Sequence, residues 1–296
     1  MNKLIGYLRL MRPANIVTSI ADVLAGIAIS GILSNELFSS DYLLPIIFLC
    51  LSTACLYGGG VVFNDVFDAD LDKIERPERA IPSGMIGLKQ AAILGSVLLI
   101  TGIVLALVSS WISCLLAFLI AFFALTYNKW GKHNALLGPL NMGMCRGLNL
   151  LLGISILSTA LNEWFFLGAI PVIYIYSITM ISRGEVHGGN RSNLYMASFL
   201  YLMVIGSVLY FSFIREKLPL TLIFMMPFFW MIFKPLIKAI KDPVGKNIGQ
   251  AVKAGVISLI LLDAAWAATF SSFYLAFIIA CLLPVSILLA KAFAVT

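Results

Sequence analysis

The sequence predicts an all-α fold, a polytopic bundle of transmembrane helices. Of the 296 residues, 61% are hydrophobic and only 11% are charged, and the mean hydropathy is +1.00. A water-soluble domain contains about 25% charged residues, so this composition excludes one. The apolar residues also gather in long uninterrupted blocks, which is typical of helices that cross a lipid bilayer.

Ten apolar blocks follow one another along the chain. Each is about 17–24 residues long, and at a rise of 1.5 Å per residue such a helix crosses a hydrocarbon core of roughly 30 Å. Residues 1–15 precede the first block, carry three basic side chains, and are expected to form an interfacial amphipathic segment. We expect the spans at about residues 16–33, 43–63, 88–108, 111–127, 138–158, 164–183, 194–214, 219–240, 248–270 and 273–294.

The blocks are expected to form one folded unit. Nothing rich in Ser, Gly or Pro separates them, and no polar stretch exceeds about 25 residues, which leaves no room for a second domain. We therefore expect a single membrane domain over residues 1–296, with the main bundle at about 16–270 and a further C-terminal span at 273–294. The five cysteines lie inside apolar blocks, without the paired spacing of a zinc or redox site.

The positive charges predict the topology. If the N-terminus is cytoplasmic, all but three of the 20 Lys and Arg residues fall on the inner side of the membrane. The exceptions are Arg146, inside a span, and Arg215 and Lys217, on the outer side. The net charge of +6 therefore reflects topology and attraction to membrane lipid, and it gives no support to nucleic-acid binding. We expect an integral protein of the plasma (inner) membrane of a prokaryote, with its active site on the cytoplasmic face.

The second block ends in a dense group of acidic residues. On a continuous helix Asn64, Asp68 and Asp72 recur every four residues, and Asp65 lies close to Asp68 and Asp72, so all four share one face, while Asp70 points elsewhere. Such carboxylates repel one another unless a cation lies among them, and ligands that offer only oxygen favour Mg²⁺ or Mn²⁺ over zinc. Because Mg²⁺ is usually shared with substrate phosphates, we expect an amphiphile with a diphosphate head. The alternative is a solvated helix end that forms salt bridges with the following basic loop.

The residues from Asn64 to Gly84, NDVFDADLDKIERPERAIPSG, resemble the first aspartate-rich motif of the UbiA superfamily of membrane prenyltransferases. Weaker similarity includes Arg12-Pro13-Ala14-Asn15, Tyr127-Asn128-Lys129 and residues 141–153. The resemblance implies a helical bundle around a membrane cavity, in which Mg²⁺ holds an isoprenoid diphosphate above an apolar tunnel. Ionisation would leave an allylic cation for an acceptor to attack.

Site residues are carried over from the family by position. The Mg²⁺ ligands would be Asn64, Asp68 and Asp72. Tyr127, Glu185 and Arg146 would be catalytic, and Arg146, a charge within a span, would pair with Asp22 or share the cavity wall with it. Asp263 also lies within a span, so it is a candidate functional residue, and the alternative is that its role is purely structural. Substrate contacts are expected from Asn64, Asp65, Arg76, Arg79, Lys129, Lys132, Arg183, Asn190 and Arg191.

Two features depart from the family pattern. The second aspartate-rich motif is replaced by residues 182–191, SRGEVHGGNR, in which Glu185 is the only acid; this resembles the EboC-type branch of UbiA-like proteins. Arg183 and Arg191 could neutralise phosphate in place of a second metal ion. The chain is also expected to have one span more than the nine that are usual in the family.

The predicted function is that of a Mg²⁺-dependent integral membrane prenyltransferase, which transfers a prenyl group from an isoprenoid diphosphate to an unidentified hydrophobic acceptor. The main alternative is a non-catalytic UbiA-like carrier or accessory protein that binds a lipid diphosphate, since the second motif is altered. An ion-coupled transporter would be expected to show paired halves with broken helices, whereas the aspartate-rich element occurs in one half only.

Overall fold

The structure is a computed structural model that describes residues 3–33, 40–134, 137–182 and 191–293. All regular structure in these ranges is helical, which confirms the all-α fold. The helices are α1 (Lys3–Met11), α2 (Pro13–Ile29), η1 (Ser40–Tyr42), α3 (Leu43–Phe67), α4 (Ala69–Glu75), α5 (Leu88–Ser109), α6 (Trp111–Lys129), η2 (Gly131–His133), α7 (Leu137–Ile154), α8 (Ser158–Trp164), η3 (Phe165–Gly168), α9 (Ala169–Ser182), α10 (Arg191–Ile214), α11 (Leu218–Lys241), α12 (Gly245–Phe270), α13 (Phe273–Ala280) and α14 (Leu282–Ala292).

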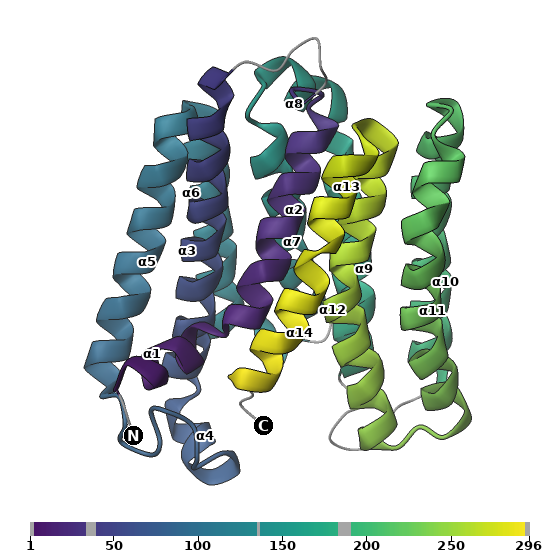
Figure 1. Cartoon of the computed structure of the whole chain (residues 1–296). Helices are drawn as coiled ribbons and strands as arrows, with labels where there is room; N and C mark the ends of the chain where they lie inside the picture. Colours follow the sequence, from purple (N-terminus) through teal and green to yellow (C-terminus); the bar gives the residue numbers. More distant parts are fainter. Residues whose placement is uncertain (1–2, 34–39, 135–136, 183–190, 294–296) are drawn as a thin grey trace.

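Each of the ten predicted blocks contains a long helix or a short run of helices. Most bounds agree within about four residues, and the largest difference is at the sixth block, where the helix run begins at Ser158, six residues before the predicted start. Figure 1 shows the long helices running side by side between two ends of the molecule. Both chain termini and α4 lie at one end and α8 lies at the other, as expected for an even number of crossings.

The length and hydropathy of the helices account for most of these crossings. Among the described residues, eight helices or helix runs are long and apolar enough to span a membrane, and the pair α1–α2, bent by 43°, raises the number to nine if it forms one span. The helix α7 is not among them, because Asn141, Arg146 and Asn149 lower its hydropathy. The chain is therefore an integral membrane protein, and ten spans remain a prediction.

The first helix turns away from the bundle at one residue. Arg12 adopts a left-handed backbone conformation with φ of 50°, and Pro13 begins α2 at a position where its missing N–H costs no hydrogen bond. Leu4 and Ile5 of α1 are exposed, whereas Gly6 packs against Met85 and Ile86. Figure 1 shows α1 beside the ends of α3 and α5, close to α4. This position agrees with an interfacial segment, which remains a prediction.

Close helix packing holds the centre of the bundle together. The helices α2 and α7 meet where Gly26 faces Gly153, and a Cβ atom built on Gly26 would lie 2.2 Å from the carbonyl oxygen of Leu150. Small residues at such a contact let two backbones approach closely. The helix α12 is the most deeply buried span, with 72% of its apolar window inside the protein. These contacts fix the positions of α2, α7 and α12 around the cavity described below.

The last predicted span is formed by α13 and α14, which are separated at Cys281. Only 17% of its apolar window is buried, so most of its surface faces outward. It packs against α2 and α12, and the Ser286 hydroxyl donates to the carbonyl oxygen of Ala14 at 2.9 Å. The tenth block is thus a peripheral helical pair that adds to the bundle without entering its centre.

Candidate active site

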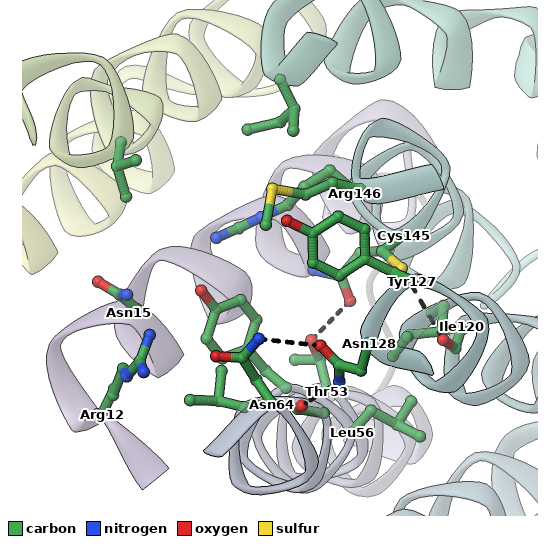
Figure 2. Close-up of a pocket in the computed structure, with 18 of the residues that line it drawn as sticks. Arg12, Asn15, Thr53, Leu56, Asn64, Ile120, Tyr127, Asn128, Cys145 and Arg146 are labelled. Atoms are coloured by element: carbon green, nitrogen blue, oxygen red, sulfur yellow. Dashed lines mark hydrogen bonds between the residues drawn. The ribbon is translucent and has the colours of Figure 1, made fainter. Parts of the chain in front are cut away.

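A cavity of about 380 Å³ lies between α2, α3, α6, α7, α9 and α12. Its wall is largely apolar, with polar groups from several helices facing the same space (Figure 2). The lining residues are Arg12, Asn15, Thr53, Leu56, Tyr57, Gly60, Val61, Asn64, Ile120, Ala124, Tyr127, Asn128, Met142, Cys145, Arg146, Asn149, Ile175, Ile178, Thr179 and Val256. An apolar cavity with a few converging polar groups is the usual form of a small-molecule site.

The aspartate-rich motif begins on α3 and continues through a break into α4. The helix α3 ends at Phe67, yet helical backbone hydrogen bonds continue. The N–H of Asp68 donates to the carbonyl oxygen of Asn64 at 3.0 Å, and the N–H of Asp72 donates to the carbonyl oxygen of Asp68 at 2.8 Å. The side chains of Asn64, Asp68 and Asp72 therefore keep their helical four-residue spacing across the junction. Asp70 is exposed and pairs with Lys73 at 2.8 Å, a hydrogen bond that lowers the pKa of the Asp70 carboxyl.

Two carboxylates of the motif belong to a buried ion-pair network. Asp65 accepts from Arg12 at 2.8 Å and lies 3.4 Å from Arg79, which also donates to Asp72 at 2.7 Å. Asp65, Asp72 and Arg79 are each less than a tenth exposed. Arg79 reaches them because the loop after α4 folds back under the end of α3. The network contains two acids and two bases and is therefore neutral.

The third carboxylate, Asp68, is half-buried and is paired with the Lys132 ammonium, which comes from the short helix after α6. Partial burial lowers the pKa of Lys132. One turn before Asp68, the Asn64 amide nitrogen donates to Asn128 at 3.2 Å, and Asn128 donates to the carbonyl oxygen of Gly60 at 2.8 Å. Figure 2 shows the amide oxygen of Asn64 turned away from Asn128, where it can accept from a ligand.

These pairs correct one step of the sequence-based argument for a metal ion. Repulsion among the carboxylates was expected to require a bound cation, but Arg12, Arg79 and Lys132 already neutralise them. In the part of the chain that the structure describes, no three His, Cys, Asp or Glu side chains form a group that could hold a metal ion. Asp72 in particular is committed to Arg79.

The donor set still fits Mg²⁺ bound together with a phosphate ligand. Asn64 and Asp68 offer oxygen atoms one helical turn apart, and Mg²⁺ needs only one or two protein ligands when phosphate supplies others. The Lys132 side chain is flexible and could move from Asp68 to a phosphate oxygen. Asp65, Asp72 and Arg79 would hold the end of α3 in place.

Deeper in the cavity, Arg146 is held by a second buried network. Its guanidinium donates to Asp22 at 2.6 Å and to Thr18 at 2.7 Å, and it lies 5.1 Å from the ring centroid of Tyr57. Asp22 is therefore the partner of Arg146, one of the two options that the sequence left open. Asn149 donates to Asp22 at 3.0 Å and accepts from Thr53 at 2.5 Å.

Tyr127 lines the cavity from α6. In Figure 2 its ring and the Arg146 side chain border the same open space. The structure thus brings Asn64, Tyr127 and Arg146 to one cavity, as expected for residues that share a substrate.

Several predicted substrate contacts are not brought to the cavity. Lys129 is exposed, with its ammonium 4.5 Å from the Trp130 ring centroid, and Arg76 is exposed at the end of α4. Arg191 is exposed at the start of α10, where it lies 3.5 Å from the carbonyl oxygen of Lys241. Arg183, Glu185 and Asn190 lie outside the described residues.

The cavity also contains polar residues that the sequence analysis did not select, namely Arg12, Asn15, Thr53, Tyr57, Asn128, Asn149 and Thr179. Four of them stand in stretches noted for family similarity: Arg12 and Asn15 before the first span, Asn128 beside Tyr127, and Asn149 within residues 141–153. Asn149 is also an amide within an apolar span, and such groups are costly in lipid. Thr53, Tyr57 and Thr179 carry no such signal.

Comparison with known proteins gives a consistent result. A model of the UbiA prenyltransferase family matches residues 23–192. Digeranylgeranylglyceryl phosphate synthase of Ignicoccus hospitalis is 31% identical over 191 residues, which cover 63% of this chain and 59% of that protein. The enzyme of the same name from Sulfurisphaera tokodaii is 30% identical over 176 residues, covering 59% and 60%. The matched part spans about three-fifths of these relatives.

Solved structures share the fold. A digeranylgeranylglyceryl phosphate synthase structure is 24% identical, with a TM-score of 0.64, covering 90% of this chain and 98% of that one. A UbiA homologue from Aeropyrum pernix is 15% identical with a TM-score of 0.66, covering 84% and 96%. One from Archaeoglobus fulgidus, bound to GPP and Mg²⁺, is 14% identical with a TM-score of 0.62, covering 86% and 99%.

Proposed function

The chain belongs to the UbiA prenyltransferase family, and we propose that it transfers a prenyl group from an isoprenoid diphosphate to a hydrophobic acceptor. The family match confirms the resemblance first noted at residues 64–84. We place the reaction at the cytoplasmic face of the plasma (inner) membrane of a prokaryote, because the basic residues and the aspartate-rich motif lie at the end of the bundle that is expected to face inward.

The observation that carries this proposal is the position of the cavity. One end is bordered by Asn64 and Arg12, at the aspartate-rich motif, and the wall continues between the helices as apolar surface from Leu56, Ile120 and Ile178. A diphosphate with an attached prenyl chain needs this combination of a polar end and an apolar path. The volume of about 380 Å³ suits a small amphiphile.

Magnesium is the cofactor that we propose for the polar end. The oxygens of Asn64 and Asp68 would hold it, with Asp72 behind them in its pair with Arg79. When bound, Mg²⁺ would stabilise the negative charge that develops on the departing diphosphate. The Archaeoglobus fulgidus homologue bound to GPP and Mg²⁺ supports this assignment.

The protein residues have separate parts in the proposed reaction. Arg12 would bind a phosphate oxygen while remaining paired with Asp65. The Lys132 ammonium would leave Asp68 and bind a phosphate oxygen instead. Tyr127, in the cavity wall, would shield the allylic cation from water through its ring face. Arg79 would keep the acidic helix end in place. From the altered second motif, Glu185 is proposed to act in catalysis, and Arg183 and Asn190 are proposed to bind phosphate.

The test is diphosphate release by the purified protein in lipid. Prenyl diphosphates of several chain lengths would be supplied with Mg²⁺ or with a chelator, and membrane extract would serve as the source of acceptor. We expect release by the wild type that requires both Mg²⁺ and extract and that Asp68→Asn abolishes. Analysis of the prenylated product would then identify the acceptor.

A non-catalytic carrier is the second candidate. It is favoured by the neutral ion pairs of Asp65, Asp68 and Asp72, which leave the acidic motif stable without a metal ion. A carrier would bind prenyl diphosphate saturably and release no diphosphate, even with membrane extract. The same assay therefore separates the two functions.

A further inference from the structure

A strongly basic surface lies where α11 is joined to α12, at the end of the molecule that also contains both chain termini and α4 (Figure 1). Residues 234–253 contain five lysines with exposed side chains and one acid, so the net charge of this stretch is +4. None of the five lysines lines the cavity described above. We call them the lysine surface: Lys234, Lys238, Lys241, Lys246 and Lys253.

The lysines form two rows on neighbouring helices. Lys234, Lys238 and Lys241 follow one another at intervals of four and three residues, which places them on one face of α11. The other two lysines stand on α12, four residues before and three residues after Gln250, again on one face. The Lys238 ammonium donates to the side-chain oxygen of Gln250 at 3.4 Å. The two rows therefore lie side by side and can act on the same ligand.

The protein does not neutralise the charge of the lysine surface. Among the described residues, none of its five ammonium groups forms an ion pair with a carboxylate. The one acid of the stretch, Asp242, accepts instead from the side chain of Asn247 at 3.0 Å. Like charges this close in sequence repel one another, and an anion placed between the rows would remove that repulsion.

The depth of the lysines in the bundle selects a membrane lipid as the anion. The span α11 ends at Lys241, so Lys234 stands about 10 Å before the helix end. Its ammonium lies 5.3 Å from the ring centroid of Trp230, which is 64% exposed. Ile237 and Val244 are exposed beside the lysines. Lysine and tryptophan at this depth are typical of the headgroup region of a bilayer, where a lipid offers both phosphate and acyl chains.

The aspartate-rich stretch at the same end of the molecule has the opposite charge balance. Residues 64–89 contain six acids and four bases, which give a net charge of −2. An anionic headgroup is therefore attracted at the lysine surface and repelled along this stretch. The general excess of positive charge at this end of the protein does not by itself produce such a difference.

We propose that the lysine surface binds the phosphate headgroup of an anionic phospholipid, in the membrane leaflet at this end of the protein. The phosphate would lie between the two rows of lysines, and the acyl chains would follow the exposed apolar face of α11 at Trp230. The lipid site is separate from the cavity and does not depend on the proposed reaction.

Two lipids with the same acyl chains test this proposal, anionic phosphatidylglycerol and zwitterionic phosphatidylcholine. Saturable binding of each radiolabelled lipid to the full chain in a neutral detergent would be measured, with inorganic phosphate as competitor. We expect phosphatidylglycerol to bind at least about tenfold more tightly, and the difference to shrink at high salt. Equal binding of the two lipids would overturn the proposal, as would displacement of phosphatidylglycerol by an equal concentration of inorganic phosphate.

A triple variant shows whether the lysine surface causes the preference. Lys238→Gln, Lys241→Gln and Lys246→Gln together remove three of its five charges and should bring the two affinities within about twofold of each other. Arginine at the same three positions keeps the charges and should keep the preference. A preference that persists in the glutamine variant would overturn the proposal.

The matched control removes three exposed lysines elsewhere at the same end of the molecule, on α4, α5 and α14. Lys73→Gln, Lys89→Gln and Lys291→Gln together change the net charge of the protein by the same amount and should leave the preference as in the wild type. Loss of the preference in this control would show that overall charge attracts the lipid, and the site at the lysine surface would be rejected. Because all the substituted side chains are exposed, every variant is expected to melt as the wild type does.

Discussion

The described residues contain two buried networks of Arg and Asp, and these differ in position and in access. At the aspartate-rich end, Asp65 and Asp72 face Arg12 and Arg79, so that two acids meet two bases. In the bundle centre, Arg146 donates to Asp22 at 2.6 Å, so that one base meets one acid. The first network is assembled from a helix junction and a loop, whereas the second is held between the long helices α2 and α7.

This difference between the networks indicates which of them can bind a charged group of a ligand. Side chains at the aspartate-rich end can exchange partners, because Arg12 is about a third exposed and Lys132 is on a short helix. The deep network cannot lose a partner without leaving a charge unpaired inside the membrane. The outer network is thus suited to binding and releasing phosphate, whereas the inner one holds α2 and α7 in fixed positions.

The largest expected effect on stability comes from breaking the deep network. Arg146→Gln leaves Asp22 without its base and should lower the free energy of unfolding by about 3–5 kcal/mol. Thermal unfolding in detergent measures this, with the exposed Arg76→Gln as control. Adding Asp22→Asn to Arg146→Gln should recover part of the loss. Equal melting temperatures for Arg146→Gln and the wild type would show that the deep pair does not hold the bundle.

A large effect on function with little effect on stability is expected at the outer network. Asp68→Asn should weaken Mg²⁺-dependent prenyl diphosphate binding by about 100-fold, or about 2.7 kcal/mol, because a metal ligand loses its charge. Binding is measured with and without chelator. The melting temperature should change little, since Asp68 is only half-buried. Undiminished Mg²⁺-dependent binding would remove Asp68 from the metal site.

The close packing of α2 against α7, one turn beyond Asp22, is tested at Gly26. An alanine Cβ there would lie 2.2 Å from the Leu150 carbonyl oxygen, so α2 and α7 must move apart. We expect Gly26→Ala to cost about 1–3 kcal/mol of unfolding free energy. Gly206→Ala is the matched control, because no atom lies within 4 Å of the added Cβ and the helix should be unharmed. Similar unfolding of the two variants would contradict the close contact.

The smallest effect is expected at the exposed pair of Asp70 and Lys73. The hydrogen bond from Lys73 lowers the pKa of Asp70, so its contribution is present above the ordinary pKa of an aspartate and is lost as the pH falls through the lowered value. Exposed pairs contribute little, and Lys73→Ala should leave the melting temperature at pH 7 within experimental error. A clearly lower melting temperature of Lys73→Ala at pH 7, with no difference from the wild type in acid, would show that this exposed pair stabilises the fold.

Much of the fold could be predicted because apolar block length follows directly from membrane thickness. The ten blocks, the cytoplasmic grouping of basic residues and the cavity positions of Asn64, Tyr127 and Arg146 all came from local pattern or family resemblance. The partner of Arg146 could be limited to few candidates because charged residues within spans are rare.

The parts that sequence did not predict depend on contacts between distant segments. Arg79 pairs with Asp72 because a loop folds back under α3, and Lys132 meets Asp68 from another helix 64 positions along the chain. The alternative interpretation of the motif includes salt bridges to the following basic loop, such as those of Arg79, but no periodicity reports the contacts of Arg12 and Lys132. The surface position of Lys129 likewise depends on which face α6 turns toward the cavity.

The most direct test of the central claim is photolabelling of the cavity. A geranylgeranyl diphosphate analogue with a diazirine in its prenyl chain would be bound to the protein in lipid, activated, and its adducts mapped by mass spectrometry. The account predicts adducts on cavity residues such as Val61, Ala124 and Ile178, lost with a chelator or with excess unlabelled diphosphate. Adducts confined to outward-facing residues such as Ile100 and Phe118, and unaffected by competitor, would contradict it.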